Sequence, residues 1–173
     1  MKTENRREQR MMQSLIAALL MALMLGLTAA PALAVHIECL AGTAACRGTQ
    51  QADVMAGTLG ADKMRGLGSN DTLMALEGED ELYGGRQDDT LRAGDGVDRL
   101  LGEVGDDKLH GGQGGDTIFG NGGEDVLYGE GGDDRLVAAP DVSNDRVYCG
   151  PGYDTAIVGY NDTPFACEEV LQR

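Results

Sequence analysis

Aspartate recurs every nine residues through the middle of the chain, and this spacing is the strongest constraint on the fold. Two residues after each of these aspartates stands Met, Leu or Ile, from Met55 to Leu136. Disordered Gly-rich chains need no such phase, so the period predicts stacked structural repeats. The ten aspartates are Asp53, Asp62, Asp71, Asp80, Asp89, Asp98, Asp107, Asp116, Asp125 and Asp134.

Glycine completes the repeat and indicates its local conformation. Gly is frequent five residues and two residues before the aspartate, which gives the unit G-x-x-G-x-D-x-U-x, where U is apolar. The first six positions favour a turn, because Gly accepts positive φ at little steric cost. The last three, such as Thr117-Ile118-Phe119, can form a short strand in which only the U residue points inward.

One such unit cannot bury its own U residue. Two successive units can do so as the halves of one coil, and coils then stack about 4.8 Å apart. We therefore predict an all-β fold, a parallel β-roll or β-helix solenoid with two nine-residue repeats per coil. The ten units predict five coils over residues 51–137.

The turns of such a stack would form columns of carboxylates. Successive turns alternate between the two edges, so Asp53, Asp71 and Asp89 share one edge while Asp62 and Asp80 share the other. Carboxylates about 4.8 Å apart repel each other unless a cation lies between them. Carboxylate and carbonyl oxygens, without His or thiolate ligands, favour calcium over magnesium, which demands a tighter octahedron.

The apolar core is small for the length of chain that must be ordered. One U side chain per nine residues offsets little of the conformational entropy lost on folding. We therefore expect the repeats to be largely unfolded without calcium and to fold cooperatively when it is added.

The segment G-G-Q-G-G-D-T-I-F at 111–119 resembles the repeats-in-toxin (hemolysin-type) calcium-binding consensus at every defining position. The resemblance covers about residues 52–137 and again 145–157. It implies a β-roll whose ions lie between the turns of units i and i+2 on one edge, bound by Asp side chains and Gly carbonyls. The metal-binding residues it implies are Asp62, Asp71, Asp80, Asp89, Asp98, Asp107, Asp116, Asp125, Asp134, Gly105, Gly111, Gly112, Gly114, Gly120, Gly123, Gly129 and Gly132.

This resemblance also implies which turns should share ions. Asp116 would share ions with Asp98 and Asp134 on one edge, and Asp107 with Asp125 on the other. Several units depart from the consensus: Gln51, Ser69 and Gln87 replace the second Gly on one edge, and Ala75 and Ala93 replace the leading Gly on the other. We expect weaker or vacant sites around Asp53, Asp71 and Asp89, and the best-formed sites after residue 96.

The N-terminal segment has the pattern of an export signal. A basic stretch from Lys2 to Arg10 precedes an apolar run from Leu15 to Leu27, and Ala32-Leu33-Ala34 has the small-x-small form of a cleavage site. We predict a signal peptide over 1–34, cleavage after Ala34 and a secreted, extracellular protein with no membrane insertion after cleavage. An uncleaved anchor remains the alternative.

Four cysteines flank the repeats and suit an oxidising compartment. Cys39 and Cys46 lie in a predicted N-terminal cap, residues 35–50, and Cys149 and Cys167 lie in residues 138–173, predicted as degenerate repeats and a C-terminal cap. The length of the stack between the pairs favours one disulfide at each end. The same distance argues against a four-thiolate zinc site.

Charge and motifs restrict the function. Without the four basic and two acidic residues of the first 34, the 14 basic and 29 acidic residues become 10 and 27, a net charge of −17. Such a chain should repel nucleic acid and anionic lipid. We predict no enzyme, because no catalytic motif is found and His36 and His110 are the only histidines. Two functions remain: a secreted, non-catalytic calcium-binding protein, or a calcium-dependent adhesion module or spacer that binds a cell-surface polysaccharide or protein.

Overall fold

The structure, a computed structural model, describes residues 35–39, 45–138 and 143–173. The chain separates into two units, Met1–Leu33 and Ala34–Arg173. The predicted signal peptide lies outside the described residues, as do 40–44 and 139–142 within the predicted caps. In the part of the chain that is described, no helix is long and apolar enough to cross a membrane.

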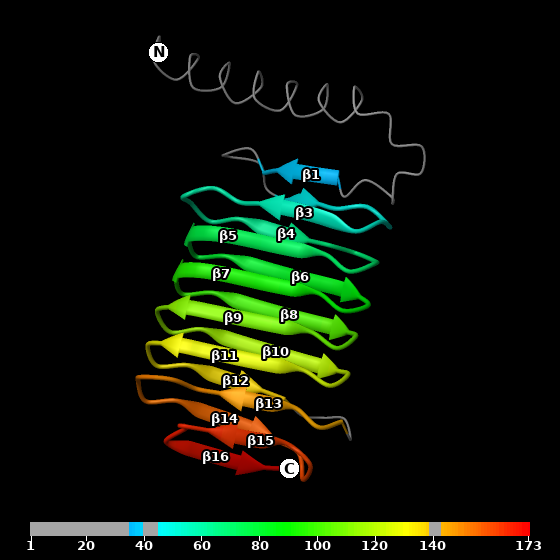
Figure 1. Ribbon diagram of the computed structural model, residues 1–173. Coiled ribbons are helices and arrows are strands. Elements are labelled where there is room, and N and C mark those ends of the chain that lie inside the picture. Colours follow the sequence, from blue (N-terminus) through cyan, green and yellow to red (C-terminus); the bar gives the residue numbers. More distant parts are fainter. Residues whose placement is uncertain (1–34, 40–44, 139–142) are drawn as a thin grey trace, which may run out of the picture. The chain divides into compact units, whose positions relative to one another are not determined.

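The second unit is a parallel β-solenoid, as predicted. Odd-numbered and even-numbered strands form two sheets that run along the stack, and the chain alternates between them (Figure 1). The odd sheet contains β1 (Val35–Glu38), β3 (Asp53–Ala56), β5 (Thr72–Gly78), β7 (Thr90–Gly96), β9 (Lys108–Gln113), β11 (Val126–Gly131), β13 (Arg146–Tyr148) and β15 (Thr163–Phe165). The even sheet contains β2 (Cys46–Arg47), β4 (Lys63–Arg65), β6 (Glu81–Arg86), β8 (Arg99–Val104), β10 (Thr117–Gly122), β12 (Arg135–Val137), β14 (Thr155–Val158) and β16 (Glu169–Gln172).

The U residues form the core, because a step of 18 residues places each one directly on its equivalent in the next coil. Leu91, for example, pairs in register with Leu73 on one side and Leu109 on the other. All ten are completely buried, which confirms the predicted inward positions. They are Met55, Met64, Leu73, Leu82, Leu91, Leu100, Leu109, Ile118, Leu127 and Leu136.

The central strands are longer than the three residues that the pattern predicted. β9 runs for six residues, so the ladder continues through the leading Gly of the next unit, Gly111. This position also faces inward, and Ala75 and Ala93, which replace the leading Gly, lie in the core. At Gly84, which occupies the same position in another unit, a Cβ would lie only 2.5 Å from Asp89 Oδ2, so a side chain does not fit without a shift. The prediction missed this because it treated Gly as a turn signal only.

The predicted caps extend the two sheets. β1 and β2 precede the first repeat coil, and β13 to β16 follow the last. Both predicted disulfides are present, Cys39–Cys46 with a Cα–Cα distance of 5.4 Å and Cys149–Cys167 with 5.2 Å. The solenoid is therefore longer than the five coils predicted, because the degenerate units keep the alternation of turn and strand.

Candidate metal centre

The repeated aspartates form a hydrogen-bonded ladder along each edge of the solenoid. One carboxylate oxygen, Oδ1, accepts the backbone N–H of the aspartate 18 residues earlier. The amide of Asp71 donates to Asp89 at 2.7 Å, and that of Asp98 donates to Asp116 at 2.9 Å. The aspartates predicted to share ions are thus neighbours: Asp116 contacts both Asp98 and Asp134, and Asp107 contacts Asp125.

The ladder continues beyond the regular repeats. Asp125 and Asp134 donate their amides to Asp145 and Asp154, two aspartates of the degenerate units that we did not predict as metal-binding. In the last coil, Glu168 Oε2 takes the place of an aspartate and accepts the amide of Asp154 at 2.9 Å. The resumed pattern N-D-R-V at 144–147 was the sequence signal for this continuation.

The second carboxylate oxygen is buried without a hydrogen-bond partner in most of these turns. The aspartates themselves are almost completely buried, with Asp107 and Asp116 each only 2% exposed. A buried anionic oxygen without a donor or a cation is strongly unfavourable. The oxygens concerned are Oδ2 of Asp71, Asp80, Asp89, Asp98, Asp107, Asp116, Asp134 and Asp154.

The pKa values of these aspartates are raised, because burial disfavours the charged form. Burial raises the pKa of Asp107 to about 8 and that of Asp89 and Asp116 to about 7, against hydrogen bonds from backbone amides that lower it. Neighbouring carboxylates raise these pKa values further. At neutral pH such carboxylates need either a proton or a cation, because burial penalises the bare anion.

Turn carbonyls supply the remaining oxygen atoms. A Cβ on Gly114 would collide with the carbonyl oxygen of Gly96, and one on Gly132 with that of Gly114. These glycines have φ between 121° and 153°, a region that other residues rarely adopt. Each turn therefore brings a carbonyl oxygen against the turn of the next coil on the same edge.

These groups form an oxygen-only donor set. Among the described residues, no three His, Cys, Asp or Glu side chains lie close enough together to bind a metal by themselves. A cation would have to combine the unpartnered Asp oxygens with Gly carbonyls, which is the ligand chemistry of calcium. Gly111, Gly120 and Gly129 lie against the aspartate of their own unit, and Gly112 lies over the carbonyl of Gly94. Gly105 and Gly123 lie over the carbonyls of Gln87 and Gly105.

The first two turns differ from the rest. In these units Thr49 and Thr58 follow the leading Gly, and their amides donate to Oδ2 of Asp53 and Asp62 at 2.6 Å. Their hydroxyls reach the same oxygens at 3.0 Å. Asp62, which we predicted as a metal ligand, therefore has an oxygen that already accepts two hydrogen bonds. The signal for this difference was Thr at the second position, which we did not use.

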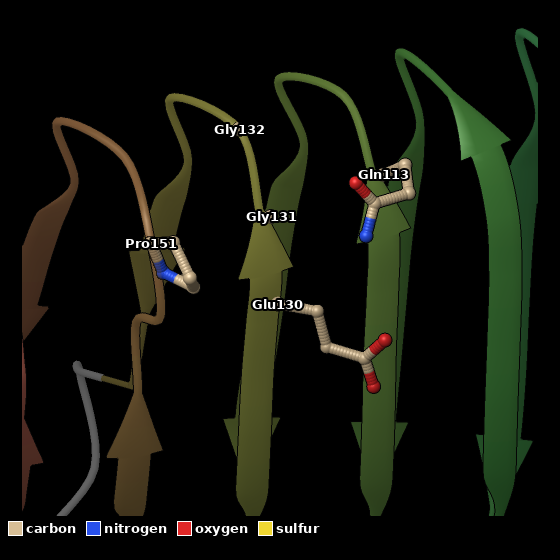
Figure 2. A pocket seen from close by; sticks show the side chains of 5 residues that line it. All are labelled: Gln113, Glu130, Gly131, Gly132 and Pro151. Carbon is tan, nitrogen blue, oxygen red and sulfur yellow. The ribbon is translucent and has the colours of Figure 1, made fainter.

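A shallow hollow lies at the ends of β9 and β11, beside the turns that lead from these strands to the even sheet. Figure 2 shows Gln113, Glu130 and Pro151 around it, with the Glu130 side chain directed toward the neighbouring strand. Glu130 Oε1 lies 2.8 Å from Nδ1 of His110 on β9. Glu130 is the one ionisable residue among those lining the hollow.

Comparison with known families agrees with this geometry. The family model of the RTX calcium-binding nonapeptide repeat (4 copies) matches residues 47–82, 75–109 and 110–139. The curated proteins and the solved structures give no match. Since the matched segments span more than half of the chain and coincide with the coils that carry the aspartate ladders, the chain belongs to the RTX calcium-binding nonapeptide repeat family.

Proposed function

We propose that this protein is a secreted, non-catalytic calcium-binding β-roll whose folding and rigidity depend on calcium. The observation that carries the proposal is the row of buried aspartate oxygens without hydrogen-bond partners on both edges. Calcium supplies the positive charge that these oxygens lack. Asp98, Asp116 and Asp134 would bind it on one edge, and Asp107 with Asp125 on the other, together with turn carbonyls.

Calcium binding and folding would then be one process. In the unfolded chain the aspartates are far apart and hydrated, so no preformed site exists, and the binding free energy becomes folding free energy. The apolar core is a single file of side chains per sheet, so it offsets only part of the conformational entropy. Without calcium the charged edges would drive the coils apart.

Export and the absence of catalysis are parts of the same proposal. Two disulfides support an oxidising, extracellular location. The aspartates repeat one structural environment, whereas catalytic acids and bases need environments that differ. No partner other than calcium is required for this role.

Circular dichroism of the full chain at neutral pH tests the folding part. We expect a strand spectrum with calcium, its loss on chelation, and its return when calcium is restored. Calorimetry should detect several bound ions. A strand spectrum unaffected by chelator, together with no calcium uptake at millimolar concentrations, would refute the proposal.

A second candidate function is binding of an acidic polysaccharide by the outer face of the even sheet. Lys63, Arg99 and Arg135 lie in one row, with Glu81 and Thr117 on the strands between them. Two strand steps separate successive cations, about 9.6 Å. Beside this row, Arg65 lies 4.7 Å from the ring centre of Tyr83, and Arg99 lies 4.8 Å from that of Phe119.

This row of cations suits a linear polymer with a negative charge at regular intervals. Sedimentation of the calcium-loaded protein with an acidic and a neutral polysaccharide tests it. Arg99→Glu should weaken binding to the acidic polymer at low salt, whereas Arg92→Glu on the odd sheet should not. Equal binding to both polymers, or equal effects of both variants, would exclude this candidate.

A further inference from the structure

We propose that the first coil of repeats closes its turns without calcium, through Thr49 and Thr58, and that the calcium array begins in the turns that follow. This inference rests on the proposed calcium-binding function and says where along the stack that function starts. Thr occupies the second position of the unit in these two turns alone among the repeats of 48–137.

The two threonines make the same set of contacts, one on each edge. The Thr58 amide and hydroxyl donate to Asp62 Oδ2 at 2.6 and 3.0 Å, and the hydroxyl accepts the amide of Gly60 at 3.2 Å. Thr49 donates to Asp53 at the same two distances and accepts the amide of Gln51 at 3.1 Å. Asp53 Oδ1 stays buried without a partner, so closure is stronger at Asp62 than at Asp53.

Backbone conformation explains why later turns remain open. In the units that follow, the second residue has positive φ: 90° at Leu67, 93° at Leu76 and 120° at Gly94. Its amide then points along the stack. The Leu67 amide donates to the carbonyl of Gly84 in the next coil at 2.9 Å, and Asp71 Oδ2 is left without a donor.

Threonine prevents this arrangement because its branched Cβ disfavours positive φ. Thr49 and Thr58 do not have positive φ, and their amides turn toward the aspartate of their own unit. Two donors on one carboxylate oxygen supply the partial positive charge that a cation supplies in later turns. A calcium ion at Asp62 would have to break both hydrogen bonds, so the closed turn disfavours the ion.

A closed first coil gives the solenoid an end that does not depend on metal. It packs against the Cys39–Cys46 disulfide, and both cysteines belong to the buried core. Coils that bind calcium can then add to an ordered edge, which reduces the cost of starting a stack.

Native mass spectrometry of the full chain in calcium tests the inference by exchanging the two kinds of turn. Thr58→Gly restores a residue that accepts positive φ and should bind one more calcium ion than the wild type. Leu76→Thr places the closing residue in the turn of Asp80, whose Oδ2 is buried without a hydrogen-bond partner, and should bind one ion fewer. Thr58→Ser keeps both donors and serves as the matched control, with no change in stoichiometry.

The outcomes separate this inference from the proposed function. A wild-type protein that binds no calcium would refute the proposed function itself. A wild-type protein that binds calcium, with the same number of ions in Thr58→Gly and Leu76→Thr, would overturn the closed-turn inference and leave the function standing. If Thr58→Gly does not fold, Leu76→Thr alone decides, since loss of one ion supports the inference and an unchanged count contradicts it.

Discussion

The two edges of the solenoid are built from the same unit but differ in one glycine position. In the turns that lead from odd to even strands, the residue two before the aspartate is always Gly; we call this the glycine edge. Its glycines are Gly60, Gly78, Gly96, Gly114, Gly132 and Gly152. In the turns that lead from even to odd strands, the mixed edge, Gly holds this position only at Gly105 and Gly123. The other residues there are Gln51, Ser69, Gln87 and Ser143.

The backbone φ at this position also differs between the two edges. Gly78 and Gly96 on the glycine edge have φ of 145° and 153°, whereas Ser69 and Gln87 on the mixed edge have 79° and 71°. A residue with a Cβ is confined to the narrow left-handed region, so it cannot reach the conformation of the glycines. We therefore expect that carboxylates in the same register do not make equivalent calcium sites, because the backbone conformation of each turn depends on whether the residue two before the aspartate carries a Cβ.

The largest expected effect is that of pH on the calcium-free protein. Burial raises the pKa of Asp107 on the mixed edge to about 8 and that of Asp116 on the glycine edge to about 7, from an ordinary value of 3.8. The folded state therefore binds more protons than the unfolded state between these values, and its stability falls as pH rises through this window. Circular dichroism in chelator should show a folded chain in acid that unfolds toward pH 8. Stability that increases over this window would contradict the burial of bare carboxylates.

The core should not distinguish the edges. Leu109 and Leu100 are both completely buried, one in each sheet. Leu109→Ala and Leu100→Ala should each destabilise the calcium-loaded protein by about 2 to 5 kcal/mol. Denaturant unfolding in excess calcium measures both. A clear difference between the two variants would place the asymmetry in the core rather than in the turns.

Removal of one carboxylate charge should matter more on the glycine edge. Asp116→Asn keeps the acceptor for the Asp98 amide but weakens calcium binding on both sides of the turn. Loss of one ion costs about 2.7 kcal/mol when calcium is 100-fold above its dissociation constant. Asp71→Asn on the mixed edge is the matched variant, and we expect a smaller loss of thermal stability from it. The reverse order would break the comparison.

The smallest effect should come from repair of the mixed edge. Gln87→Gly provides the conformation found at Gly105, and we expect tighter calcium binding at Asp89 and Asp107. The same change releases a strained φ, for a gain of up to about 1 kcal/mol. Calcium titration by calorimetry measures the affinity. Gly105→Gln, the opposite exchange, should weaken binding, and an unchanged affinity in both variants would show that the Cβ at this position is irrelevant.

Much of this fold could be predicted from single positions. The inward direction of Leu100 and Leu109 followed from the period of nine, and the pairing of Cys39 with Cys46 followed from the length of the stack. Other features could not be predicted in this way. Tyr83, Phe119 and Tyr128 all follow a U residue, but Tyr128 lies on the odd sheet and the other two on the even sheet.

The ring of Tyr128 belongs to a stack of rings that crosses several coils of the odd sheet. Its ring stacks on His110 at 4.6 Å and on Tyr148 at 5.0 Å, and Tyr148 stacks on Phe165 at 4.9 Å. Tyr148 and Phe165 belong to degenerate units, and their register is set by strand pairing rather than by a repeat. The ladder of four rings therefore emerged only when the coils were stacked.

The sequence by itself determined the repeat, the inward residues, the two columns of aspartate and the choice of calcium chemistry, because these follow from residue type and period within one unit. The tertiary structure decided which aspartate oxygens have partners, how far the strands extend and how many coils the ends add. These features depend on contacts between a residue and its equivalent in the next coil. They also depend on φ at positions such as Thr58 and Gln87, where one side chain decides whether the turn closes on itself or stays open to an ion.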